Sequence, residues 1–145
     1  MFTNWFETKS TKIGFEDVHH AIKNPETHIL INTLSTADQD CLIKSTLPSD
    51  QEERVINELL AGYQYTTKIL IIYGRNSSDS SVEKKQRQLT ALGFSQVYVY
   101  SGGLFEWVLL QDIYGNDEFP TSRKVLDILR FKPSGLLVKP RLAWS

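Results

Sequence analysis

The residues best suited to chemistry form a short polar loop between a predicted buried strand and a predicted helix. Its members are mostly small and polar: Gly74, Arg75, Asn76, Ser77, Ser78, Asp79, Ser80 and Ser81. Such a loop gathers backbone N–H groups at the positive end of a helix, where they can cradle an anion or activate a thiolate. Arg75 and the serines could therefore line an anion pocket. Alternatively they only cap the helix and satisfy the loop, because the charge of Asp79 would repel an anion and raise the pKa of a nearby thiol.

Other reactive side chains are few. Cys41 is the single cysteine, so one chain can build neither an intramolecular disulfide nor a thiolate metal cluster. We expect a buried or half-buried thiol there, with a redox or sulfur-carrying role as the alternative. His19 and His20 are adjacent on a predicted helix and point about 100° apart, which is poor for chelation. We therefore expect no metal and no cofactor.

The elements that must position this loop are strands alternating with helices. Apolar runs rich in branched residues predict buried parallel strands at 28–32, 68–73 and 96–100, and a shorter strand at 44–47. Apolar stripes with start and stop signals predict helices at 15–22, 49–61, 80–92, 103–110 and 124–129. The third of these starts with Ser80-Ser81-Val82-Glu83, which has the form of a capping box. Alternating strands and helices indicate an α/β fold, with about five parallel strands and helices on both faces.

Composition fits one globular domain. The chain has 145 residues, of which 41% are hydrophobic and 23% are charged. Sixteen basic and 17 acidic residues give a formal net charge of −1, which argues against a nucleic-acid binder and against adhesion to an anionic membrane. The start of the sequence has no signal-peptide pattern, and the longest apolar runs are too short to span a membrane. We expect a cytoplasmic protein.

Charge and hydrophobicity are uneven near the C-terminus. Residues 103–120 contain four acidic residues and no basic one, whereas residues 123–141 contain six basic residues and one acidic residue. These runs are either solvated faces with a mobile tail or a docking surface for an acidic partner. The tail is apolar enough to need a cover. We expect Leu136, Leu137 and Trp144 to be largely buried, against this domain or against a second copy in a homodimer formed through the C-terminal extension.

The order of these elements resembles the rhodanese-like family from about residue 12 to residue 121. Single motifs are weak, but together and in order they are specific. The most specific is Ser101-Gly102-Gly103-Leu104-Phe105-Glu106-Trp107, which is similar to the family's Gly-Gly-x-x-x-Trp signature. The other similar stretches are 29–32, 41–48, 71–75 and 92–99. Residues 111–115 and 119–121 resemble a divergent subgroup of unicellular eukaryotes and their large DNA viruses, so for a viral chain the host cytoplasm or the virion is the expected location.

The resemblance implies one rhodanese-like domain, with a core at about 12–121 and an extension at 122–145. It also implies that the reacting residue is missing. Active members carry at the position of Gly74 a cysteine that stores sulfur as a persulfide, and without a thiol that intermediate cannot form. The strand-end aspartate of the family is Asn32 here, and the family's histidine is Leu42. The arginine with which phosphatase relatives end this loop is absent from 76–81.

We therefore predict a sulfurtransferase fold without the activity, that is, a pseudoenzyme that acts as a binding or regulatory module. Its partner is expected to be another protein. The alternatives are an enzyme or binder for a small anionic ligand, held by the 74–81 loop, and a residual sulfurtransferase. The ligand-binding candidates are Asn32, Gly74, Arg75, Ser77, Ser78 and Ser80. A cysteine placed at position 74 is expected to react but to turn over poorly, opposed by the charge of Asp79 and by backbone angles that only glycine accepts.

Overall fold

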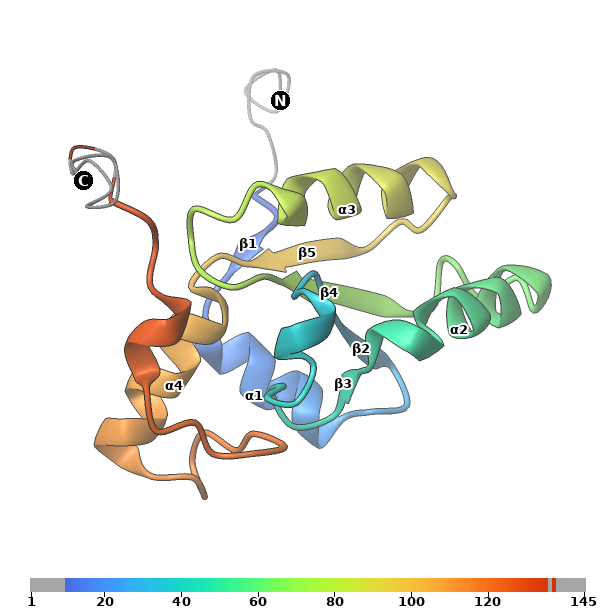
Figure 1. The fold of residues 1–145 in the computed structure, drawn as a ribbon. Coiled ribbons are helices and arrows are strands. Elements are labelled where there is room, and N and C mark those ends of the chain that lie inside the picture. The colour runs from blue at the N-terminus through green and yellow to red at the C-terminus, as the bar shows by residue number, and fades with distance from the viewer. Residues whose placement is uncertain (1–9, 136, 138–145) are drawn as a thin grey trace, which may run out of the picture.

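The protein was analysed as a computed structural model that describes residues 10–135 and residue 137. Along the chain the elements are β1 (Lys12–Ile13), α1 (Phe15–Lys23), β2 (His28–Asn32), the 3-10 helix η2 (Thr36–Asp38), β3 (Thr46–Leu47), α2 (Ser49–Ala61), β4 (Ile69–Tyr73), α3 (Ser81–Ala91), β5 (Val97–Tyr100), α4 (Gly103–Tyr114) and the 3-10 helix η3 (Ile128–Phe131). Figure 1 shows their arrangement.

The strands form one parallel sheet in the order β1-β5-β4-β2-β3, as expected for strands joined by helical crossovers. β4 lies at the centre of the sheet, and Ile71 pairs with Leu30 of β2 on one side and with Tyr98 of β5 on the other. The strand at β1 contains only two residues and was not predicted. Because all five strands run in the same direction, their carboxyl ends meet at one edge, where the 74–81 loop begins.

Helices cover both faces of the sheet, which confirms the predicted α/β architecture (Figure 1). In β4, Leu70 and Ile72 point to the layer of α2 and α3, whereas Ile71 and Tyr73 point to the layer of α1 and α4. Side chains alternate along a strand, so one apolar strand supplies both cores. Among the helices of the described residues, none is long and apolar enough to cross a membrane.

The predicted helix at 124–129 is wrong. The segment instead makes a single 3-10 turn, η3, over Ile128–Phe131. A helix of six residues is marginal by itself, and here the packing of Val125, Ile128 and Phe131 against the core fixes the chain in another shape. α4 is longer than predicted and reaches Tyr114 before Gly115, whose φ of 99° ends the helix.

The core extends to Phe131, which has no exposed surface and belongs to the cluster of α1 and α4. Beyond it, the predicted burial of Leu137 against this domain is wrong, because Leu137 is 94% exposed. The chain leaves η3 in an extended conformation at Lys132, and Leu137 lies beyond the last buried residue of this turn. Leu136 and Trp144 lie outside the described residues.

We expect Phe131→Ala to lower the free energy of unfolding by about 3–5 kcal/mol, the usual cost of emptying a buried aromatic site. Leu129→Ala, in the same turn but 60% exposed, should change it by about 0.5 kcal/mol or less. Urea unfolding monitored by circular dichroism measures the free energy of unfolding of both variants. Similar midpoints for the two variants would contradict the placement of Phe131 in the core.

Candidate functional site

The 74–80 loop between β4 and α3 is fastened to the N-terminus of α4. The Leu104 N–H donates to the Gly74 carbonyl oxygen at 2.9 Å, and the Phe105 N–H donates to that of Arg75 at 3.0 Å. Gly103 makes this close approach possible. Its φ is 67°, and a Cβ there would lie 3.0 Å from the backbone of Asn76 and from the Gly74 oxygen. The glycine pair of the sequence motif therefore fixes the shape of the loop.

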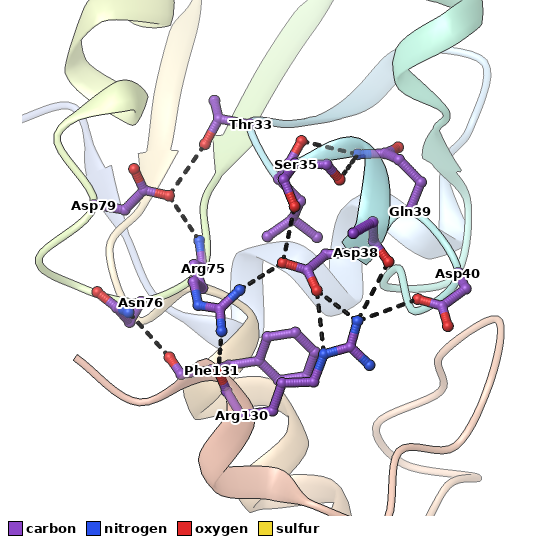
Figure 2. Close-up of polar contacts among 12 residues, drawn as sticks. Thr33, Ser35, Asp38, Gln39, Asp40, Arg75, Asn76, Asp79, Arg130 and Phe131 are labelled. Atoms are coloured by element: carbon purple, nitrogen blue, oxygen red, sulfur yellow. Dashed lines mark hydrogen bonds and ion pairs between the residues drawn. The ribbon is translucent and has the colours of Figure 1, made fainter. Parts of the chain in front are cut away.

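The carboxylate of Asp79 lies inside the cradle that this loop forms. Its Oδ2 accepts a hydrogen bond from the Arg75 N–H at 3.0 Å, and its Oδ1 accepts one from the Ser81 N–H at 3.0 Å. The hydroxyls of Ser81 and Thr33 donate to the two oxygens at 2.5 and 3.4 Å. Figure 2 shows Asp79 between Thr33 and Arg75. The protein thus supplies its own anion to the cradle, whereas the sequence suggested only that Asp79 would repel one.

The same carboxylate occupies the space that a side chain at position 74 would need. A Cβ built on Gly74 would lie 2.5 Å from Asp79 Oδ2 and 2.6 Å from Cγ2 of Val82. Gly74 is not among the residues with positive φ, so the expected backbone obstacle to a cysteine is not found. The obstacle is crowding by Asp79 and Val82.

Hydrogen bonding stabilises the charged form of Asp79. Burial raises the pKa of its carboxyl, but the bonds from the Arg75 N–H and from the N–H and hydroxyl of Ser81 outweigh burial and hold the pKa below its ordinary value. Asp79 also performs the capping that the sequence assigned to Ser80. The Ser80 side chain makes no capping bond, and the predicted capping box does not form.

Arg75 points away from the cradle into an ion-pair cluster. Its guanidinium contacts Asp38 at 2.5 Å and donates to the carbonyl oxygen of Arg130, and Arg130 contacts the other oxygen of Asp38 at 2.5 Å. Both guanidinium groups lie over the ring of Phe131, at 5.4 and 5.2 Å from its centre (Figure 2). Only 5% of Asp38 is exposed, so its charge depends on these partners.

Asn76 links the loop to the same C-terminal turn. Its Nδ2 donates to the Phe131 carbonyl oxygen at 3.0 Å, and its Oδ1 accepts from the Ser78 N–H at 2.9 Å. The turn η3 therefore covers the loop from the side opposite Asp79. Asp38, Arg130 and Phe131 were not predicted as site residues. The only sequence signal for Arg130 was its place in the basic run that follows residue 122.

The other candidate residues are divided between the interior of the protein and its surface. Asn32 is 2% exposed, and its amide is satisfied by the Gln39 amide, the Leu34 N–H and the Leu47 carbonyl oxygen. Gly74 is buried under Asp79 and Val82. Three candidates face solvent at the mouth of the loop, namely Ser77, Ser78 and Ser80.

Cys41 is buried, and its thiol donates to the Arg123 carbonyl oxygen at 3.3 Å. Burial and the nearby charge of Asp40 raise the pKa of this thiol, so the reactive thiolate is disfavoured. His19 packs against Trp107 and Phe119, with ring centres 5.2 and 4.7 Å apart. Within residues 10–135, no three His, Cys, Asp or Glu side chains are grouped to hold a metal ion.

The fold, the 74–80 loop and the glycine motif at residues 102–103 are consistent with the family whose profile matches this chain. The profile of the rhodanese-like domain matches residues 27–110, more than half of the chain. This chain belongs to the rhodanese-like domain family. The matched segment contains β2, β4, the loop, α3, β5 and most of α4, which are the elements that build the cradle.

Solved structures share the fold at low sequence identity. BH2092 of Bacillus halodurans superimposes with a TM-score of 0.56 and 21% identity, covering 79% of this chain and 80% of that one. Ygr203w, a yeast protein tyrosine phosphatase of the rhodanese family, gives 0.56 and 17%, covering 84% and 99%. The Saccharomyces cerevisiae single-domain sulfurtransferase RDL2 gives 0.51 and 18%, covering 75% and 98%. No curated protein sequence matches the chain at a significant level.

We expect Asp79→Asn to lower the free energy of unfolding at neutral pH by about 0.5–2 kcal/mol, the range for loss of a helix cap. In the unfolded chain the Asp79 pKa is about 3.9, and the folded-state value is lower. The ionised carboxylate therefore stabilises the fold above the unfolded pKa, and this contribution disappears as the pH falls through the folded pKa.

Urea unfolding of both proteins at neutral pH and in acid, below the unfolded pKa of about 3.9, measures this dependence. The difference between wild type and Asp79→Asn should shrink in acid. A difference that stays the same at both pH values would contradict the role of the charged carboxylate.

Crowding at position 74 gives a second expectation. In a Cys41→Ser background, the thiol of Gly74→Cys should react slowly with iodoacetamide, because its Cβ competes for space with Asp79. Adding Asp79→Ser should speed the labelling, since the space opens and the like charge disappears. The rate of iodoacetamide labelling is measured across a pH series for the Gly74→Cys variant and for the variant that also carries Asp79→Ser. Equal rates for the single and double variants would show that Asp79 does not occupy this position.

Proposed function

We propose that this protein is a non-catalytic rhodanese-like domain that acts by binding a partner protein. One observation carries the proposal: the Asp79 carboxylate fills the loop at the place where active relatives hold the reacting sulfur. The resemblance to the family implies a persulfide on a cysteine at position 74. This chain has no side chain there, and its own carboxylate takes up the space and the backbone N–H groups.

Sulfur transfer through another residue finds no support. The attacking species would be a thiolate, and the only cysteine is buried at position 41. Its thiol donates to a backbone oxygen, and its pKa is raised. A persulfide on Cys41 would also lie outside the 74–81 loop, away from the N–H groups that stabilise negative charge.

Binding of a small anion is also disfavoured by the geometry. The N–H groups of Arg75 and Ser81 already donate to Asp79, and the Arg75 guanidinium is paired with Asp38. An anion would have to displace a carboxylate that is covalently part of the loop. It would gain no free cation from Arg75 in return, because that charge is already neutralised.

A fixed loop without a reacting group is suited to recognition. Gly103 and η3 hold its backbone, while the hydroxyls of Ser77, Ser78 and Ser80 face solvent at its mouth. We assign the contact with the partner to these three serines rather than to the buried Asn32 and Gly74. The loss of cysteine at position 74 fits the catalytically silent subgroup, and its origin in unicellular eukaryotes or their viruses is part of the same proposal.

The proposal predicts no thiocyanate from thiosulfate and cyanide above a control without protein. The same protein should not hydrolyse p-nitrophenyl phosphate, because the loop offers neither a thiolate nor a free anion cradle. Cys41→Ser is the matched variant. Thiocyanate formation by the wild type would contradict the proposal, and its loss in Cys41→Ser would assign the activity to Cys41.

A further inference from the structure

The outer side of α4 carries exposed apolar side chains next to the exposed Asp112. Trp107 and Val108 on the inner side are buried, while Leu109 and Ile113 on the outer side are 38% and 69% exposed. A helix with apolar residues all round is normally enclosed. Figure 1 shows α4 beside the chain that passes through η3, on the side of the molecule away from α2.

A groove runs between α4 and the chain that leads into η3. It has a volume of about 310 Å³, and Val108, Val125 and Ile128 give it apolar walls. Leu126 borders it and is 91% exposed, and Leu129 in the following turn is 60% exposed. With the exposed Leu126 in its lining, this groove is an apolar feature of the kind that marks a docking site. Leu109 and Ile113 are exposed on the same helix but do not line the groove.

The groove lining carries one charge of each sign, and further acidic residues lie next to it in the sequence. Asp112 lines the groove, and Asp117 and Glu118 follow in the connection after α4. None of the ion pairs among the described residues involves these three carboxylates. Lys124 is the one basic residue in the lining, and Asp127 lies just before η3. A matching occupant must therefore combine apolar side chains with positive charge.

We propose that the C-terminal segment of the same chain, residues 138–145, binds in this groove. The segment contains Lys139 and Arg141, no acidic side chain, and the apolar Val138, Leu142 and Trp144. It follows η3, which packs against α4. From Gly135 the remaining ten residues can extend about 33–36 Å, enough to turn back onto a neighbouring helix. The inference is independent of the proposed function, because it concerns a different face.

The fluorescence of Trp144 tests this docking in the full chain. Trp5→Phe removes one interfering signal, and Trp107 is buried and does not respond to a quencher. In the docked state Trp144 should be shielded from acrylamide, and its emission should shift to shorter wavelength. Leu126→Ser, in the lining of the groove, should shift the emission to longer wavelength and raise the quenching constant towards that of free tryptophan. The matched control is Leu92→Ser at the end of α3, where the side chain is 51% exposed, and it should change neither value.

Exchanging the charges of Asp112 and Arg141 gives a second test of the docking. Asp112→Lys should expose Trp144, and adding Arg141→Asp should restore the shielding, because the attraction is re-formed with opposite signs. The proposal is overturned if Trp144 of the Trp5→Phe protein is as accessible to acrylamide as free tryptophan. It is also overturned if the serine variant in the groove and Leu92→Ser have the same effect on Trp144. Shielding that is lost on dilution, together with a dimeric mass in light scattering, would also overturn it and assign the groove to the tail of a second copy.

Discussion

The site of this protein depends on one hydrogen-bonded carboxylate. The Asp79 carboxylate accepts hydrogen bonds from two backbone N–H groups: that of Arg75 at the start of the loop and that of Ser81 in the first turn of α3. The Ser81 N–H would otherwise be unsatisfied at the N-terminus of α3, where a negative charge is favoured. The resemblance to the family implies that such donors serve a reacting anion, and we propose that the internal carboxylate takes its place here. The loop therefore keeps its shape without sulfur, substrate or cofactor.

A second charged cluster holds the loop from the opposite side. Asp38 of η2 is almost fully buried and is neutralised by Arg75 and Arg130, which both stack on Phe131. Removing either arginine would take the guanidinium partner from one oxygen of the buried Asp38 carboxylate, so the three parts of the chain depend on one another. The C-terminal turn thereby becomes part of the core and of the site, although it follows the segment that carries the resemblance to the family.

The sequence predicted the features that depend on local pattern. The apolar runs located β2, β4 and β5, and the position of Gly74 after a buried strand located the loop and the missing thiol. The charge of Asp79 led us to expect repulsion of an anion, but not a carboxylate inside the loop. The position of that carboxylate depends on backbone N–H groups that only the folded loop brings together. The contacts of Asp38 with Arg75 and Arg130 join residues 37 and 92 positions apart, and no local pattern encodes them.

We propose that Asp79 closes the cradle to outside anions. The most direct measurement is an NMR titration that follows the backbone amide signals of Arg75 and Ser81 during addition of thiosulfate or phosphate. Sodium chloride at matched ionic strength is the control. We predict that both signals move no more with either anion than with chloride, because their hydrogen bonds already go to the carboxylate. Saturable shifts confined to these two amides would contradict the claim and show that the loop still binds anions.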